Sequence, residues 1–254
     1  MSEEQKQEFK FPTETIDLPS GGKVYSKDSP LSSGKIELKY MTAKEEDILT
    51  SQNLIKKGIV VKKLLDSLIV GDNISSDDLI LGDKNAIMVA ARILAYGPEY
   101  RVEMANPNTG NLFEHTFDLT ECEFKEIDVE ISGNEFDIEL PFSKTKITFK
   151  LLTGRDEQKI DEELSSYKKL GGVAPELTTR LKHTIVSVNG DDSQQAINNF
   201  VDNALLSRDS LFLRGEIMKV SPDINLDQEI EIEGESVTVT IPMTANFFWP
   251  NARK

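Results

Sequence analysis

Cysteine is nearly absent from this sequence, since Cys122 is the only one in 254 residues. A single thiol can form neither an intrachain disulfide nor a cysteine zinc site, and it is typical of a protein made in a reducing cytoplasm. Histidine is also scarce: His115 and His183 are the only two, and neither belongs to a closely spaced ligand motif such as HExxH. The sequence therefore predicts no disulfide framework and no metal site.

A long hydrophobic run is missing as well. The opening MSEEQKQEFK is charged, so it lacks the apolar stretch of a secretory signal. The most apolar segment, residues 86–96, contains Arg92 and is shorter than the roughly 20 apolar residues that span a bilayer. We interpret this segment as a buried core helix and expect no membrane partner.

Basic residues are too few to balance the acidic ones. Lysine and arginine number 29 against 44 aspartate and glutamate residues, which gives a net charge of −15. Such a surface repels nucleic-acid phosphates and anionic lipids, so neither is an expected partner. Twelve acidic residues lie within residues 99–139, where Arg101 and Lys125 are the only basic ones. This stretch is either a docking face or, as we prefer, the solvated side of two strand hairpins.

Catalytic motifs are absent too. The sequence has no GxxxxGK[ST] loop, no GxGxxG turn and no GxSxG elbow, and Cys122 has no histidine near it in sequence to activate it. Carboxylates are abundant, but a glycosidase needs two at a defined separation, one of them with a raised pKa, and the sequence does not give these. We therefore expect no enzymatic activity and no cofactor.

What the sequence does contain is an internal repeat. The segment KIELKYMTAKEEDIL, from Lys35, returns loosely as KITFKLLTGRDEQKI, from Lys146. Each copy alternates apolar and polar residues, which predicts a strand. A capping box follows, because Thr42 stands three residues before Glu45 and Thr153 stands in the same place in the second copy. Each strand is therefore expected to lead into a helix.

A second pair of segments extends the repeat. DKNAIMVAARILAYGPEY, from Asp83, aligns without gaps to SRDSLFLRGEIMKVSPDI, from Ser207. The alignment matches Pro98 with Pro222, and a proline at this point ends a helix and favours extended backbone before it. Alternating strands around the turns NPNTGN and EGES then predict a hairpin in each copy.

These patterns predict a fold of the α+β class with two duplicated lobes, each made of a strand, helices and an antiparallel hairpin. Between the lobes, FKEIDVEISGNEFDIELPF predicts a third hairpin with Gly133 and Asn134 at its turn. The expected organisation is an amino-terminal extension in residues 1–34, a first lobe in 35–119, a connecting hairpin in 120–145, and a second lobe with an aromatic segment in 146–254.

The aromatic segment is the one candidate site. Phe247, Phe248 and Trp249 are consecutive, so they cannot all point to one side of a strand. Beside a proline and a basic tail, an exposed aromatic suits a partner-binding anchor. The alternative is that these rings close the core of the second lobe, and the sequence favours neither.

Several long segments resemble one family. They are residues 17–51, DLPSGGKVYSKDSPLSSGKIELKYMTAKEEDILTS, and, in the second half, LKHTIVSVNGDD, NALLSRDSLFLRGEIMKVSPDIN and IPMTANFFWP. Together they resemble the baseplate hub family of T-even (T4-like) contractile-tailed phages over nearly the whole length. The resemblance implies a non-enzymatic hub subunit or hub assembly factor that binds other hub or tail proteins in the host cytoplasm.

The resemblance also bears on metal binding. Several members of that family carry paired cysteines in their hairpins, as in a small zinc ribbon. Here the turns NPNTGN and EGES contain no cysteine, so the zinc feature does not carry over.

Two alternative functions stay open. The first is a transient tail assembly chaperone that is absent from the virion, whereas a hub subunit would persist in the tail baseplate. The second is a hydrolytic hub component that cuts cell-wall glycan, for which the sequence offers no identifiable carboxylate pair.

Overall fold

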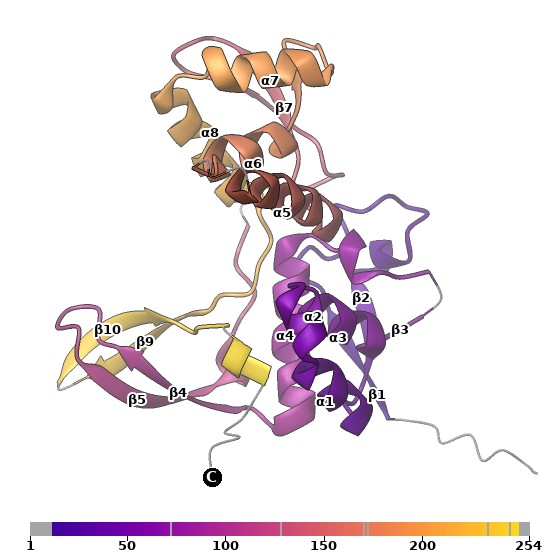
Figure 1. Cartoon of the computed structure of the whole chain (residues 1–254), viewed down its shortest axis with the longest axis vertical. Coiled ribbons are helices and arrows are strands. Elements are labelled where there is room, and N and C mark those ends of the chain that lie inside the picture. Colours follow the sequence, from indigo (N-terminus) through magenta and orange to yellow (C-terminus); the bar gives the residue numbers. More distant parts are fainter. Residues whose placement is uncertain are drawn as a thin grey trace, which may run out of the picture.

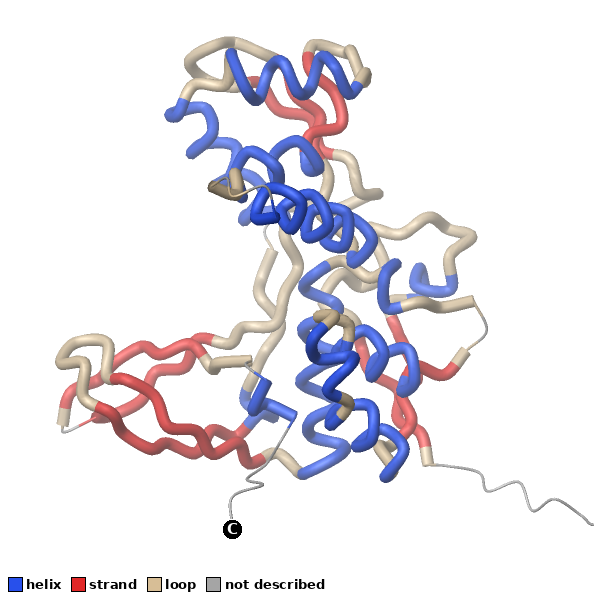
Figure 2. Tube along the Cα trace, viewed as in Figure 1, coloured by secondary structure: helices blue, strands red, loops and turns tan. Residues whose placement is uncertain are grey.

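The chain folds into three parts: two mixed bodies of helices and strands, and a lobe of two packed hairpins (Figure 1). The computed structural model describes residues 12–248 except residues 72, 128, 170, 172, 233 and 244. Helices and small antiparallel sheets alternate along the chain, as Figure 2 shows. The predicted α+β class is therefore confirmed.

The first body is a three-stranded antiparallel sheet covered by helices. Its strands are β1 Thr13–Asp17, β2 Lys35–Lys39 and β3 Ile69–Val70, and its helices are α1 Ala43–Thr50, α2 Gln52–Lys56, α3 Val60–Leu68 and α4 Leu81–Tyr96. The strand β2 is central and alternates exposed and buried residues, so Ile36 and Leu38 face the helices. They pack there against Leu65 and Ile87, all four side chains being buried.

The second body has the same plan. Its strands are β6 Phe136–Glu139, β7 Lys146–Phe149 and β8 Ile185–Val188, and its helices are α5 Gly154–Lys169, α6 Glu176–Thr184, α7 Gln194–Asn203 and α8 Ser207–Val220. The central strand β7 buries Ile147 and Phe149, which belong to one apolar core with Leu213 of α8. Val24 and Ile80 of the first half join this core, so the two bodies share apolar contacts.

The hairpin lobe brings together segments from both halves of the chain. It consists of β4 Glu99–Ala105, β5 Leu112–Asp118, β9 Asp227–Ile232 and β10 Glu235–Thr240. The inner faces of the two hairpins form one core with α3 and α4, and this core includes Tyr100, Phe117, Val237 and Val239. Short 3-10 helices complete the fold: η1 Pro30–Ser33, η2 Ser76–Asp78, η3 Leu119–Glu121 and η4 Ala245–Phe248.

The predicted capping boxes are present in both bodies. At the start of α1, the carboxylate of Glu45 accepts hydrogen bonds from the backbone N–H of Thr42 at 2.9 Å and its hydroxyl at 2.6 Å. The ammonium group of Lys39 lies 2.9 Å from the same carboxylate. At the start of α5, Asp156 accepts the N–H of Thr153 at 3.0 Å and an ammonium hydrogen from Lys150 at 2.8 Å.

Glu45 makes stability depend on pH. Burial alone would raise its pKa, but the hydrogen bonds that it accepts from Ser67, Thr42 and Lys39 outweigh burial and lower the pKa to about 2. A carboxyl whose pKa is lower in the folded chain stabilises the fold above its ordinary pKa, and this stabilisation is lost as the pH falls towards the folded value.

We therefore expect Glu45→Gln to flatten the loss of stability between about pH 4.5 and pH 2. Urea unfolding midpoints measured across this range would show it. Asp47→Asn, which changes an exposed carboxylate on the same helix, is the control. Its urea midpoint should fall with pH as that of the wild type does. If the urea midpoints of wild type and Glu45→Gln fell equally as the pH is lowered, this assignment would be contradicted.

The predicted organisation stays a prediction, and two strand pairings bear on its boundaries. Residues 13–17 of the predicted extension, residues 1–34, belong to the first body, because β1 pairs with β2 in full register from Thr13↔Lys39 to Asp17↔Lys35. Within the predicted connecting hairpin, residues 120–145, the strand β6 pairs with β7, from Phe136↔Phe149 to Glu139↔Lys146, rather than with the segment before Gly133.

Tertiary contacts explain why the connecting hairpin is replaced. The side chain of Asn134 accepts the N–H of Leu151 at 2.8 Å and donates to its carbonyl at 2.9 Å, and Gly133 donates its N–H to Lys23 of the first body. The turn residues are therefore tied to distant backbone. Phe124 makes a single bridge to Ile224 in place of a hairpin partner.

The duplication itself stays a prediction, and the matching order of elements in the two bodies supports it. Asp83 of α4 accepts the N–H of Ser20, between β1 and β2, and Asp209 of α8 accepts the N–H groups of Phe142 and Ser143, between β6 and β7. The sequence alignment instead matches Asp83 with Ser207. The structural correspondence of the two aspartates therefore differs by two residues from the sequence alignment. This difference arises at the starts of the helices, since α4 has 16 residues and α8 has 14.

Candidate functional site

The aromatic segment at the end of the described chain is inside the core. Phe247 and Phe248 lie in η4 and are 1% and 4% exposed. The ring of Phe247 meets Tyr100 edge to face at 5.0 Å and Phe248 at 5.2 Å. Trp249 lies outside the described residues. Burial favours the core alternative for the two phenylalanines, and a partner role for the segment stays a prediction.

The acidic stretch forms, in part, the solvated face that the sequence suggests. On the β4–β5 hairpin, Tyr100 and Phe117 point inwards, while the opposite face is exposed to solvent. This outer face carries the side chains Glu99, Arg101, Glu103, Leu112, Glu114, Thr116 and Asp118. Arg101 pairs with Glu114, which leaves Glu99 and Glu103 without an ion-pair partner among the described residues.

A third surface, which we call the α8 face, was not apparent from the sequence. Leu211 and Met218 are seven residues apart on α8, so they lie on the same side of the helix, and both are 64% exposed. Phe212 and the preceding Leu206 are exposed beside them, and so is Phe142 in the turn between β6 and β7. The α8 face consists of Phe142, Leu206, Arg208, Leu211, Phe212, Arg214 and Met218.

The α8 face is cationic in an acidic protein. The guanidinium group of Arg208 stacks over the ring of Phe142 at 5.1 Å, and the Nζ of Lys125 donates to the carbonyl of Met218 at 3.2 Å. Neither Arg208 nor Arg214 has a carboxylate within ion-pair distance in the part of the chain that the structure describes. Exposed apolar side chains and unpaired cations therefore share one surface, which is the composition of an interaction surface.

The signal for the α8 face was present in the sequence but ambiguous. An apolar position repeating along a helix predicts burial, and Leu213 of the same helix is indeed fully buried. Only the fold shows that α8 is covered on one side, so that Leu211 and Met218 face solvent.

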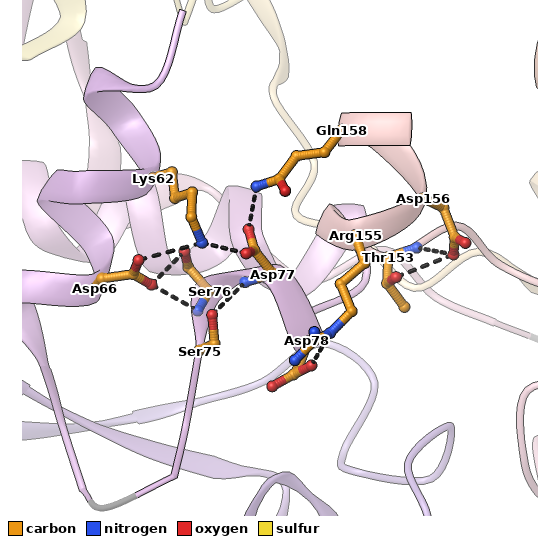
Figure 3. A network of polar contacts seen from close by, with 10 residues as sticks. All are labelled: Lys62, Asp66, Ser75, Ser76, Asp77, Asp78, Thr153, Arg155, Asp156 and Gln158. Carbon is orange, nitrogen blue, oxygen red and sulfur yellow. Dashed lines mark hydrogen bonds and ion pairs between the residues drawn. The ribbon is translucent and has the colours of Figure 1, made fainter. Parts of the chain in front are cut away.

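Where the two bodies meet, a polar network joins them, as Figure 3 shows. Lys62 of α3 lies between Asp66, at 3.3 Å, and Asp77 of η2. Across the junction, Gln158 of α5 donates to Asp77 at 2.7 Å, and Arg155 pairs with Asp78 at 2.6 Å.

The carboxylates of this junction serve the fold. Burial tends to raise the pKa of Asp66, but the hydroxyl and N–H of Ser76 and the charge of Lys62 outweigh it and keep the pKa below its ordinary value. A general acid needs a raised pKa, so Asp66 does not have the property that this role requires.

Two glycines allow the close approach of the bodies. A Cβ at Gly154 would lie 2.8 Å from the Cα of Asp77, and one at Gly82 would lie 1.8 Å from the carbonyl oxygen of Pro222. The N–H of Gly154 donates to Leu79 at 3.0 Å. Backbone therefore meets backbone at both points, and any side chain would separate the two bodies.

Asp83 is a carboxyl whose pKa burial raises. It is fully buried, and burial raises its pKa although Tyr25 and Ser20 donate hydrogen bonds that lower it. Tyr25 donates its hydroxyl to Asp83 at 2.5 Å and accepts the N–H of Ile80 at 3.1 Å. These contacts fix the loop after β1 on the start of α4, and the enclosed side chains present no acid to a substrate.

A polar hollow lies on the outer face of the second sheet. It measures about 570 Å³ and is open to solvent, with Asp137, Thr148 and Ser187 in its wall. These side chains bond one another: Thr148 donates to Asp137 at 2.7 Å, and Ser187 donates to Thr148 at 3.0 Å. The row satisfies its own hydrogen bonds and so resembles an ordinary solvated sheet face.

The residues considered for metal binding or nucleophilic chemistry lie apart. His115 packs on the ring of Phe117 at 4.6 Å, and Nε2 of His183 is 3.3 Å from Glu163. Burial raises the pKa of the Cys122 thiol, which makes it a poorer nucleophile. Within the residues that the structure covers, no group of three histidine, cysteine or acidic side chains could hold a metal ion. Nor does that part of the chain contain a helix with the length and apolarity needed to cross a membrane.

Comparison with known proteins gives one match. The model of a family described as T4 bacteriophage base plate protein matches residues 11–249, which is nearly the whole chain. No curated protein and no solved structure matches. The family match runs through both bodies and the hairpin lobe, so it concerns the complete fold rather than one element.

Proposed function

Because the chain belongs to the family of T4 bacteriophage base plate proteins, we propose that it is a non-enzymatic hub subunit or hub assembly factor of a contractile-tailed phage. Family membership gives the structural or assembly role in the baseplate, and with it an association with other baseplate or tail proteins. The assignment to the hub is our proposal. The observation that carries it is the extent of the match, residues 11–249.

The distribution of polar groups supports a function through protein contacts. The charged clusters at the junction and at the helix starts are used by the fold, since each carboxylate accepts donors from neighbouring elements. Exposed apolar side chains and two arginines lie together instead on the α8 face. A broad surface of this composition suits another protein better than a small substrate.

We also propose that the segment from Phe247 to Trp249 contributes to partner binding. The two phenylalanines fix the segment on the hairpin lobe through Tyr100 and the surrounding core. Aromatic anchors are common at the centres of protein interfaces, and truncating one commonly costs about 2 kcal/mol of binding free energy or more. Trp249, next to the anchored rings, is the residue that we assign to the partner.

Copurification from phage-infected cells tests this function. Tagged wild-type chain should retain other baseplate hub proteins, identified by mass spectrometry, and Trp249→Ala should retain at least about tenfold less of them. Tyr167→Ala, which removes a partly exposed aromatic ring from α5, is the control and should copurify as the wild type does. If the wild type retains no phage protein, the proposed function fails; if Trp249→Ala copurifies normally, the assignment of Trp249 fails.

Two further measurements separate the alternatives. Mass spectrometry of purified virions should find the chain if it is a hub subunit, and a tail assembly chaperone would be absent from them. A zymogram of the pure protein on cell-wall glycan should show no clearing. Clearing would instead establish the hydrolytic alternative.

A further inference from the structure

The α8 face has an electrostatic counterpart on the same molecule. Its unpaired cations, Arg208 and Arg214, flank the exposed Leu211 and Met218. At the hairpin lobe, the outer face of β4–β5 carries the unpaired anions Glu99 and Glu103. The chain as a whole has a net charge of −15, so the cationic α8 face is the exception that needs a reason.

Both surfaces also expose apolar side chains to solvent. Leu112 stands opposite Ala105 on the outer face of β4–β5 and is 69% exposed, two positions along the ladder from the facing carboxylates Glu103 and Glu114. Like charges directly opposite one another destabilise a hairpin. Arg101 already pairs with Glu114, so Glu103 is the carboxylate of this facing pair that is left for a cation of a partner.

We infer that the chain associates with a second copy of itself, head to tail, with the α8 face of one copy on the outer β4–β5 face of the next. Arg208 and Arg214 would then meet Glu99 and Glu103, and Leu112 would lie against the exposed apolar side chains of α8. The opposite charges and the exposed leucine of the β4–β5 face are what favour a second copy as the occupant.

The two surfaces lie on different parts of the molecule. In Figure 1, α8 belongs to the upper body, whereas β4 and β5 form the lower edge of the hairpin lobe. Each copy therefore uses two different surfaces, the α8 face towards one neighbour and the outer β4–β5 face towards the other, so the contact is heterologous. Repetition of such a contact generates a closed ring when the rotation permits closure and an open filament when it does not.

Sedimentation of the purified full chain tests this inference without any other phage protein. Wild type should associate in a concentration-dependent way at about 50 mM salt, and association should be at least about tenfold weaker at about 1 M salt, where the Debye length is only about 3 Å. Leu211→Ser with Met218→Ser, which removes apolar contacts at exposed positions, should weaken association to a similar degree.

Charge reversal identifies the two surfaces. Arg208→Glu with Arg214→Glu should be monomeric, and so should Glu99→Lys with Glu103→Lys. An equimolar mixture of these two variants should associate again, because each reversed surface then meets an opposite charge. Lys44→Glu with Lys63→Glu, exposed on α1 and α3, alters the net charge as much as the first variant does and should associate like the wild type.

Each result decides the inference. A wild type that stays monomeric overturns it, as does a mixture that fails to associate. Loss of association in the control would overturn it too, since net charge rather than these surfaces would then be responsible. The proposed baseplate function is judged separately, by copurification with other phage proteins.

Discussion

Replacing Gly82 with alanine should lower the free energy of unfolding by about 3 kcal/mol, the upper range for overpacking a buried site. The added Cβ would lie 1.8 Å from the carbonyl oxygen of Pro222 and 2.8 Å from the Cα of Asp223. Both are backbone atoms, so no side chain can rotate away. The start of α4 would have to separate from the segment that leads to β9, and the shared cores would open with it.

The matched control is Gly215→Ala in α8. This glycine is also helical, but a Cβ there would have no atom within 4 Å. Alanine should therefore stabilise the chain by about 0.5–1 kcal/mol through its better helix propensity. Urea unfolding followed by circular dichroism measures both variants. Equal effects at the two positions would show that Gly82 does not set the contact with Pro222.

Phe247→Ala should lower the free energy of unfolding by about 3–5 kcal/mol, as large-to-small changes of buried phenylalanines do. Phe247 is 1% exposed and lies between the rings of Tyr100 and Phe248. Its removal leaves a cavity where η4 meets the first hairpin. The loss should appear as a lower urea midpoint in the absence of any partner.

Phe212→Ala is the control for Phe247→Ala. Phe212 belongs to the α8 face and is 36% exposed, so its truncation should cost clearly less stability. A Phe247→Ala variant as stable as wild type would mean that the ring is not part of the core. Its effect on copurification could then be assigned to binding rather than to folding.

The elements that the sequence predicted correctly are those specified by local signals. The capping boxes at Thr42 and Thr153 mark the starts of α1 and α5, and Pro98 and Pro222 follow the ends of α4 and α8. Alternation and turn residues were enough to place both hairpins of the lobe. In each case the residues concerned lie within a few positions of one another.

The elements that it missed depend on partners far along the chain. Phe136 lies in a strand as the pattern suggested, but its partner is Phe149 of β7 rather than the segment before Gly133. A period-two pattern gives the geometry of a strand and leaves its partner undetermined, so the bonds between Asn134 and Leu151 could not be foreseen.

The candidate site was partly hidden for the same reason. Nothing in the neighbourhood of Leu211 or Met218 distinguishes them from the fully buried Leu213, because exposure depends on which side of α8 the other helices cover. Consecutive aromatics suggested that at least one of Phe247, Phe248 and Trp249 would face away from its lobe, and Trp249 lies outside the described residues. A 3-10 helix buries both phenylalanines, since it does not place successive side chains on opposite faces as a strand does.

The packing of the β9–β10 hairpin on the β4–β5 hairpin affects how the chain folds during translation. Phe117 and Val237 belong to one core, yet the ribosome makes Val237 about 120 residues after Phe117. At a translation rate of roughly 5–20 residues per second, the inner face of β4–β5 stays exposed for roughly ten seconds before the second hairpin is made. During that interval the nascent chain exposes two hydrophobic strands with free edges, which are the usual starting point of aggregation. The long sequence separation of the two hairpins therefore leaves the first one uncovered until the second has been made.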